Sequence, residues 1–249
     1  MNKLEKEMSL LDHLTELRRR LIIIIAVLFL GMVLGLFVAQ PVYQYLVSAE
    51  TARHLVFHVF SFWDGIGLYM KIAMIVALAL TLPCALFQLW AFVSPGLLPK
   101  ERRAALRYIP FVFLMFMIGV LFAYYIVFPM ALTFTSQVTR SMGLEETYGV
   151  VQYFTFMSNI VFPVAALFEL PLIIMFLTTL RILSPALLRK MRRIAYFVLV
   201  FIAVVVTPPD FISDILVAIP LLGLYELSVF LSSIVYRKQQ ASDREKLEE

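Results

Sequence analysis

Six runs of apolar residues, joined by short polar connections, limit the possible folds of this chain more than any other feature. By hydropathy the runs cover about residues 21–38, 66–93, 105–129, 150–180, 193–206 and 211–236. Most are long enough to form a helix that crosses a hydrocarbon core of about 30 Å. None has the alternating pattern of the strands in a membrane β-barrel. With 62% hydrophobic and only 15% charged residues, the sequence predicts an all-α integral membrane protein with six transmembrane helices.

The basic residues indicate how these helices are oriented. Eighteen of the 21 lysines and arginines fall in the segments on the same side of the membrane as both termini. The other side receives only Arg53 and Arg140, while Lys71 lies near a helix end. Because cytoplasmic loops are enriched in lysine and arginine, both termini are predicted to be cytoplasmic. This topology also accounts for the net charge of +4, so the charge gives no indication of nucleic-acid binding.

The same pattern divides the chain into three parts. Residues 1–20 have leucines at helical spacing, which predicts a cytoplasmic amphipathic helix lying along the membrane interface. Residues 21–236 form the six-helix transmembrane domain. Residues 237–249 form a charged cytoplasmic tail, for which we expect disorder from Gln239 onward.

The apolar runs differ in length, and this predicts the shape of the domain. The second and fourth runs would form helices of roughly 42 and 46 Å, whereas the fifth would reach only about 21 Å. Long helices must tilt or bend, so we expect a curved, cup-like wall in which the last two spans form a short hairpin. Outer loops at about 39–65 and 131–149 are expected to cap the outer face. Prolines inside the runs predict kinks at Pro83, Pro110, Pro163, Pro171 and Pro220.

The sequence contains none of the motifs that usually identify an enzyme. No HExxH, GxSxG, P-loop or glycine-rich dinucleotide turn is present, so we expect no catalytic residues and no cofactor. Cys84 is the only cysteine and lies within an apolar run, which predicts neither a disulfide nor a cysteine metal site. His54 and His58 are four residues apart but have no recognisable third ligand, so no metal site is expected.

Two glutamates inside apolar runs need an explanation. Glu169 and Glu226 precede Arg181 and Arg237 by twelve and eleven residues, which would place both roughly 16–18 Å from the cytoplasmic side. A carboxylate at that depth is costly, so it should face protein or water. One hypothesis is a polar patch, shared with Gln88, that receives a partner helix. The other is a neutral glutamate that is hydrogen-bonded within the helix packing.

Two other functions are open alternatives. A proton-coupled transporter could use Glu169 and Glu226 as a relay, and solute-linked proton uptake in liposomes would distinguish it. The chain could also be a purely structural membrane scaffold.

Asp210 and Asp214 follow a double proline. We expect them to lie at the outer surface, where they would cap the last span.

Two acids on the predicted cytoplasmic side are candidates for binding a basic peptide. Glu101 lies in the loop between the second and third runs, surrounded by basic residues, and Glu16 lies just before the first run. Two carboxylates at the membrane interface suit two guanidinium groups, which bind carboxylates as a fork. The neighbouring Arg20 and Arg102 compete for the same acids, so pairing within the chain remains the alternative.

Four segments carry a resemblance to a known family. They are His13-Leu-Thr-Glu-Leu-Arg-Arg-Arg-Leu21, Gln88-Leu-Trp-Ala-Phe-Val-Ser-Pro-Gly-Leu-Leu-Pro-Lys-Glu-Arg-Arg103, Phe168-Glu-Leu-Pro171 and Thr207-Pro-Pro-Asp210. In this order they resemble the signature segments of the TatC family, the polytopic receptor of the twin-arginine protein translocase. The resemblance extends from about residue 9 to residue 236.

The resemblance implies a function in protein export across the bacterial cytoplasmic membrane. TatC proteins bind the twin-arginine signal peptides of folded proteins at the cytoplasmic face, through acids that match Glu16 and Glu101 and an aromatic that matches Phe92. The glutamate matching Glu169 is linked to partner and signal-peptide contacts. Single-span TatA- and TatB-type partners dock around Thr207, close to Asp214, where some relatives carry glutamine. The resemblance also implies self-association and transport driven by the proton motive force, without nucleotide.

Overall fold

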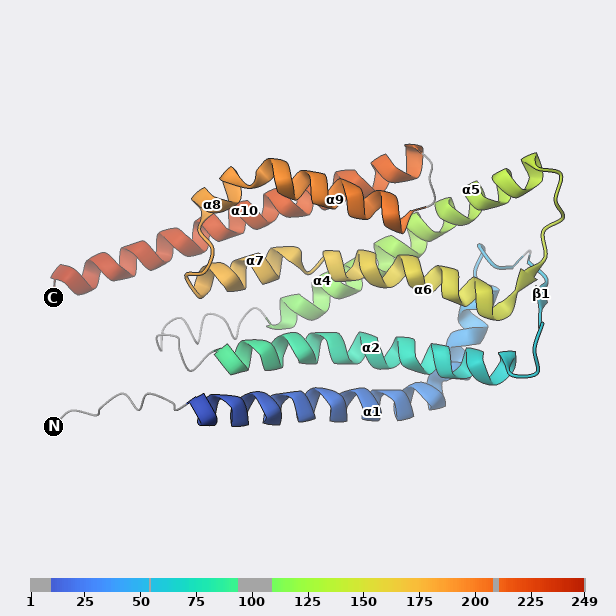
Figure 1. Cartoon of the computed structure of the whole chain (residues 1–249), viewed down its shortest axis with the longest axis horizontal. Coiled ribbons are helices and arrows are strands. Elements are labelled where there is room, and N and C mark those ends of the chain that lie inside the picture. Colours follow the sequence, from blue (N-terminus) through green and yellow to red (C-terminus); the bar gives the residue numbers. More distant parts are fainter. Residues whose placement is uncertain (1–9, 54, 94–108, 208–210, 249) are drawn as a thin grey trace.

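The computed structural model describes residues 10–53, 55–93, 109–207 and 211–248, which are almost entirely helical (Figure 1). The helices are α1 (Leu10–Ser48), α2 (Asp64–Val93), α4 (Ile109–Phe122), α5 (Phe128–Ser141), α6 (Val150–Leu167), α7 (Leu170–Thr179), α8 (Pro185–Lys190), α9 (Arg192–Val206) and α10 (Phe211–Glu248). A π-helical segment, η2 (Ala123–Val127), joins α4 to α5, and two short strands, β1 (Phe57–His58) and β2 (Tyr148–Gly149), pair with each other. The predicted all-α class is confirmed.

The described helices include five stretches that are long and apolar enough to cross a membrane. These are Leu14–Ser48, Asp64–Leu89, Phe111–Ser141, Val150–Thr179 and Asp214–Ala241. Helix α9 has only 15 residues, about 22 Å at helical rise, as expected for the short fifth run. In Figure 1 the end of α9 and the start of α10 do not reach as far as β1 and the end of α5, which lie at one end of the molecule. Six spans and a cup-like wall stay predictions.

The two ends of the described chain lie at the same end of the molecule. In Figure 1 the start of α1, the end of α2, the end of α7 and the end of α10 are together, opposite β1 and the end of α5. This arrangement agrees with the prediction that both termini are on one side of the membrane. That this side is the cytoplasmic one stays a prediction, based on the basic residues.

Helices α1 and α2 lie side by side over most of their length (Figure 1). Their backbones approach each other closely where α1 has a glycine. A Cβ atom on Gly35 would lie 2.5 Å from the carbonyl oxygen and 2.8 Å from the Cα of Ala73. A Cβ atom on Gly31 would lie 3.0 Å from the Cα of Ala77. Membrane helices associate by close packing of small residues, because lipid supplies no hydrophobic drive. These two glycines therefore determine how closely α1 approaches α2.

One of the predicted proline kinks is a full break between two helices. Helix α6 ends at Leu167 and α7 begins at Leu170, just before Pro171. Pro171 has no N–H and its ring crowds the carbonyl four residues earlier, and the regular α-helix is interrupted at Phe168 and Glu169. Other prolines lie inside helices that continue past them: Pro83 in α2, Pro163 in α6 and Pro220 in α10. Pro110 is the second described residue of α4.

The two loops at the end of the molecule opposite the termini are shorter than predicted, and they are joined. Helix α1 continues to Ser48 and α5 to Ser141, so the loops cover only 49–63 and 142–149. Residues near the end of α1 stay helical because Tyr43 packs on Phe154 of α6, with ring centroids 5.9 Å apart. In the loops, β1 pairs with β2 in parallel. His58 lies in β1 rather than in a helix, and His54 lies outside the described residues.

Glu146 organises the second of these loops. Its Oε1 accepts hydrogen bonds from Ser136 and, at 2.8 Å, from Nε of Arg140, while its Oε2 accepts one from the Tyr148 hydroxyl at 2.8 Å. The hydrogen bond from Ser136, followed by those from Arg140 and Tyr148, lowers the pKa of Glu146 to about 2. The carboxylate thus connects α5 to the residue that begins β2.

This network predicts how stability depends on pH. A carboxyl whose pKa is lower in the folded state stabilises that state above its unfolded pKa, and the contribution is lost as pH falls through the folded pKa. We expect thermal stability in detergent to decrease from about pH 4.5 to about pH 2, and to decrease less in Glu146→Gln. The same scan on Glu145→Gln, a change in the exposed neighbour, is the control. Identical profiles for Glu146→Gln and the unmodified protein would contradict this role.

Two predictions about the ends of the chain need revision. Helix α1 has no break near residue 20, so residues 10–20 belong to the same helix as the first apolar run, and their place along the membrane interface stays a prediction. The prediction of disorder from Gln239 is wrong, because α10 extends to Glu248 and the Gln239 amide donates to the Thr179 carbonyl at 2.8 Å. Extending an existing helix through good helix formers avoids the cost of nucleation, which a composition argument ignores.

Candidate functional site

An arginine of the chain joins Glu16 of α1 to Gln88 of α2. Arg20 donates to Glu16 Oε1 from Nη2 at 2.6 Å and from Nε at 3.2 Å. Its Nη1 donates to Gln88 Oε1 at 3.1 Å. The pair Glu16–Arg20 follows from i,i+4 spacing on a helix, whereas Gln88 is 68 residues away from Arg20. The sequence therefore predicted competition between Arg20 and a ligand for Glu16, but it missed the bond to Gln88.

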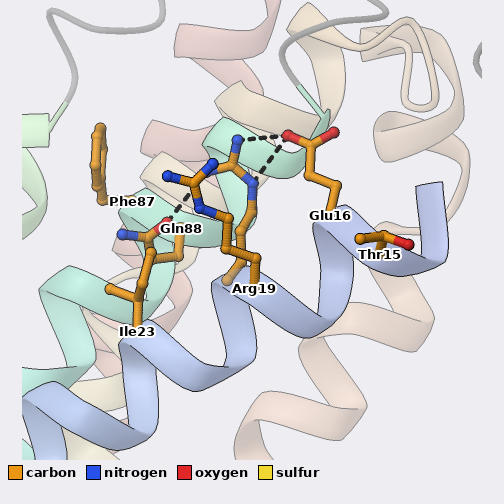
Figure 2. Close-up of a pocket in the computed structure, with 7 residues that line it drawn as sticks. Thr15, Glu16, Arg19, Ile23, Phe87 and Gln88 are labelled. Carbon is orange, nitrogen blue, oxygen red and sulfur yellow. Dashed lines mark hydrogen bonds and ion pairs between the residues drawn. The ribbon is translucent and has the colours of Figure 1, made fainter. Parts of the chain in front are cut away.

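This cluster lies in a pocket between the start of α1 and the end of α2 (Figure 2). We call it the α1–α2 pocket; its volume is about 600 Å³. It is lined by Thr15, Glu16, Arg19, Arg20, Ile23, Phe87 and Gln88. The Glu16 and Arg20 side chains are each 22% exposed, and Gln88 is 8% exposed. Hydrogen bonds in such a partly dehydrated site are stronger than those on an open surface.

Acceptors in the α1–α2 pocket are arranged for a guanidinium group. Glu16 and Gln88 approach one planar group from two helices, and the bonds to Glu16 come from adjacent nitrogens of the fork. Phe92 follows Gln88 by one helical turn and is half-buried near the end of α2. Glu101, the other predicted acid, lies outside the described residues. Of the three predicted peptide-binding residues, Glu16 and Phe92 thus belong to the same end of the α1–α2 pair.

Glu169 lies at the break between α6 and α7 and is 1% exposed. Its carboxyl is close to the backbone of Phe116 in α4. Within the described part of the chain, neither carboxyl oxygen has a hydrogen-bond partner. The side chain faces protein, as the sequence predicted, but it does not make the hydrogen bond that a purely structural role would supply.

Both carboxylate oxygens of Glu226, by contrast, accept hydrogen bonds from side chains of α9. Its Oε2 accepts from Nη2 of Arg192 at 2.6 Å, and its Oε1 accepts from the Tyr196 hydroxyl at 2.5 Å. Arg192 is the first residue of α9, so Glu226 lies level with the start of that helix. The predicted depth of Glu226 within the membrane stays a prediction. Sequence reasoning missed both partners of Glu226, which are 34 and 30 residues away along the chain.

Thr207 and Asp214 form a small polar contact between α9 and α10. The Thr207 hydroxyl is 2.6 Å from Oδ1 of Asp214 and 2.8 Å from the carbonyl oxygen of Ala203. Thr207 is buried. Asp210, predicted at the same turn, lies outside the described residues. The structure thus brings Thr207 and Asp214 together near the short end of the α9–α10 hairpin.

Among the described residues, no group of three or more His, Cys, Asp or Glu side chains is arranged to hold a metal ion. The predicted site residues that the structure describes, apart from Phe92 near the end of α2, lie in four separate places. These are the α1–α2 pocket, the α6–α7 break, the start of α9 and the α9–α10 turn.

Comparison with known proteins identifies the family. The family model described as Sec-independent protein translocase protein (TatC) matches residues 12–220. The Sec-independent protein translocase protein TatC of Halalkalibacterium halodurans is 44% identical over 245 residues, which cover 98% of this chain and 97% of the relative. The Sec-independent protein translocase protein TatCy of Bacillus subtilis is 42% identical, over 95% of this chain and 93% of the relative.

A solved structure agrees with this assignment. The crystal structure of the twin-arginine translocase receptor TatC is 30% identical, with a TM-score of 0.74, and the match covers 90% of this chain and 99% of that one. The family is one of protein translocase components, and the apolar helices are those of a multi-pass membrane protein. This chain therefore belongs to the TatC family.

Proposed function

We propose that this chain binds the twin-arginine signal peptides of folded export substrates at the cytoplasmic face of the bacterial cytoplasmic membrane. Glu16 and Glu101 would bind the arginines, and Phe92 would contact the peptide beside them. One observation carries the proposal: a guanidinium group already occupies the α1–α2 pocket, held by Glu16 and Gln88. The acceptors therefore have the geometry that an arginine side chain of a peptide needs.

Physical chemistry favours arginine over lysine at such a site. A guanidinium group offers parallel N–H donors in a fixed plane, whereas an ammonium group is a compact point charge. In the structure the two bonds from Arg20 to Glu16 both end on Oε1. A peptide guanidinium group could bond to both carboxylate oxygens of Glu16, a two-pronged contact that an ammonium group cannot match. A second peptide arginine would use Glu101, in the connection that follows α2.

The same proposal includes the partners of the translocase. Single-span TatA- and TatB-type subunits would dock at the α9–α10 turn, which contains Thr207, Asp210 and Asp214. Glu169 and Glu226 would contact these partners or the peptide only after rearrangement, because the first is buried and the second is ion-paired. Self-association, lipid contact and use of the proton motive force complete the proposed role.

Removing both acids tests the docking site. In purified protein, Glu16→Gln combined with Glu101→Gln should weaken binding of a twin-arginine peptide by at least about 100-fold, since each of the two charge-assisted contacts contributes about 1.5–3 kcal/mol. Fluorescence anisotropy of a labelled peptide measures the affinity. Crosslinking from position 101 tests whether the bound peptide lies beside Glu101.

Glu50→Gln, in the loop after α1 at the opposite end of the molecule, is the control and should bind like the unmodified protein. Unchanged affinity in the double variant would refute the proposed function.

A further inference from the structure

The α1–α2 pocket contains a charge arrangement that peptide binding alone does not require. Two arginines of the chain line it, and one of them, Arg20, makes three hydrogen bonds inside it. These bonds use Glu16 Oε1 and Gln88 Oε1, the acceptors best placed for a guanidinium group. Arg19 also lines the pocket but is exposed, and within the described residues it makes no such bond.

We infer that Arg20 is an internal competitor of the signal peptide, whose guanidinium group must leave Glu16 and Gln88 before a peptide arginine can bind there. This inference rests on the proposed function. It assigns Arg20 a role in setting the affinity of the site rather than in contacting the peptide. The competing group is chemically identical to the ligand group, so an exchange preserves every type of bond at the acceptors.

Two geometric observations support displacement. The Arg20 side chain is joined to α1 through a flexible four-bond stem and is 22% exposed, so it can swing into water without moving the helix. Gln88 belongs to α2 and is 8% exposed, so it remains in place as an acceptor when Arg20 leaves. An arriving guanidinium group would then find the same carboxylate and amide oxygens.

The consequence is a threshold for binding. When only a fraction of molecules has an open site, the apparent affinity of every ligand decreases by that fraction. The reduction is equal for good and poor ligands, so poor ligands fall below a useful affinity first. A site that meets many basic protein surfaces would in this way retain only sequences that bind strongly.

The test compares two arginines that line the same pocket, of which Arg20 bonds to Glu16 and Gln88 and Arg19, within the described residues, does not. Peptide affinity is measured in full-length protein carrying Arg20→Gln or Arg19→Gln, with one twin-arginine peptide and one twin-lysine peptide. Both changes remove one positive charge from the pocket, so Arg19→Gln measures the general electrostatic effect. We expect Arg20→Gln to bind the twin-arginine peptide about tenfold more tightly than Arg19→Gln does. The ratio between the two peptides should stay the same, because both have to displace Arg20.

Other results would overturn the inference. Affinity in Arg20→Gln that is equal to or lower than in Arg19→Gln would show that Arg20 does not compete. A changed ratio between the two peptides would show that Arg20 contacts the peptide. If Arg20→Gln does not fold, Arg20→Lys retains the charge without the fork; it should also bind more tightly, and unchanged or weaker binding would again refute competition.

The outcome for Glu16 separates this inference from the proposed function. Loss of binding in Glu16→Gln, without tighter binding in Arg20→Gln, would refute only the role of Arg20. Unchanged binding in Glu16→Gln would refute the docking site itself.

Discussion

Replacing Gly35 by leucine is expected to separate α1 from α2 and to lower the free energy of unfolding by about 3 kcal/mol. The cause is contact between backbones: the first side-chain atom at this position would lie 2.5 Å from the Ala73 carbonyl oxygen. A backbone cannot change rotamer, so the two helices must move apart. The bond between Arg20 and Gln88 joins the same helices, and it should be lost as well. Separation would also move Gln88 of α2 away from Glu16 of α1, so the two acceptors could no longer hold one guanidinium group, and peptide binding should decrease together with stability.

Gly223→Leu is the matched control for this change. Gly223 lies in α10, and a Cβ atom there would meet nothing within 4 Å. Both substitutions increase helix propensity by the same amount. The difference in free energy of unfolding between the two variants therefore measures the effect of the clash at Gly35. Thermal unfolding in detergent measures stability, and spin-label distances between α1 and α2 measure their separation. A Gly35→Leu protein as stable as Gly223→Leu would show that the helices are not held at this distance.

Glu169 is expected to give effects of opposite sign with two substitutions. Glu169→Leu should raise the free energy of unfolding by about 2 kcal/mol, because it removes a buried carboxyl whose oxygens have no partner. Glu169→Lys should lower it by about 3 kcal/mol or more, because it places an ammonium group beside Phe116 and Phe168 without a counter-charge. Thermal unfolding of both variants in detergent measures this.

Changes at exposed Glu145 provide the reference, since neither leucine nor lysine there should alter stability by more than about 0.5 kcal/mol. If Glu169 also contacts a partner subunit, Glu169→Leu should combine higher stability with lower export, as is common for functional sites. Destabilisation by Glu169→Leu would instead indicate that the carboxyl makes a stabilising contact.

The sequence predicted the helical class and the short fifth run because both depend on local composition. Apolar runs report burial in lipid directly, and run length reports helix length. It erred at the ends of helices. Residues 39–48 are too polar for a hydropathy run, yet they remain helical because Ala39 is buried and Tyr43 packs on α6. Such stabilisation comes from tertiary contacts, which no single-sequence window contains.

Among the site residues, too, the sequence predicts local contacts but not contacts between helices. A contact between Glu16 and Arg20 follows from helical spacing, and the sequence suggested it. The bond from Arg20 to Gln88, and those from Glu226 to Arg192 and Tyr196, depend on which helices are neighbours. A polar Gln88 inside an apolar run was the one available signal, because a buried amide needs a partner. The identity of that partner required the fold.

The strand pair has a mechanical consequence. It ties the loop between α1 and α2 to the loop between α5 and α6 at one end of the molecule (Figure 1). The α1–α2 pocket lies at the opposite end of the same helices. If the α1–α2 pair rotated against the other helices, the rotation axis would lie near the β1–β2 pair. The displacement of α1 and α2 would then increase with distance from these strands. A small angular change would therefore separate the α1–α2 pair from the other helices most at the end that contains the pocket, and least at the strand pair.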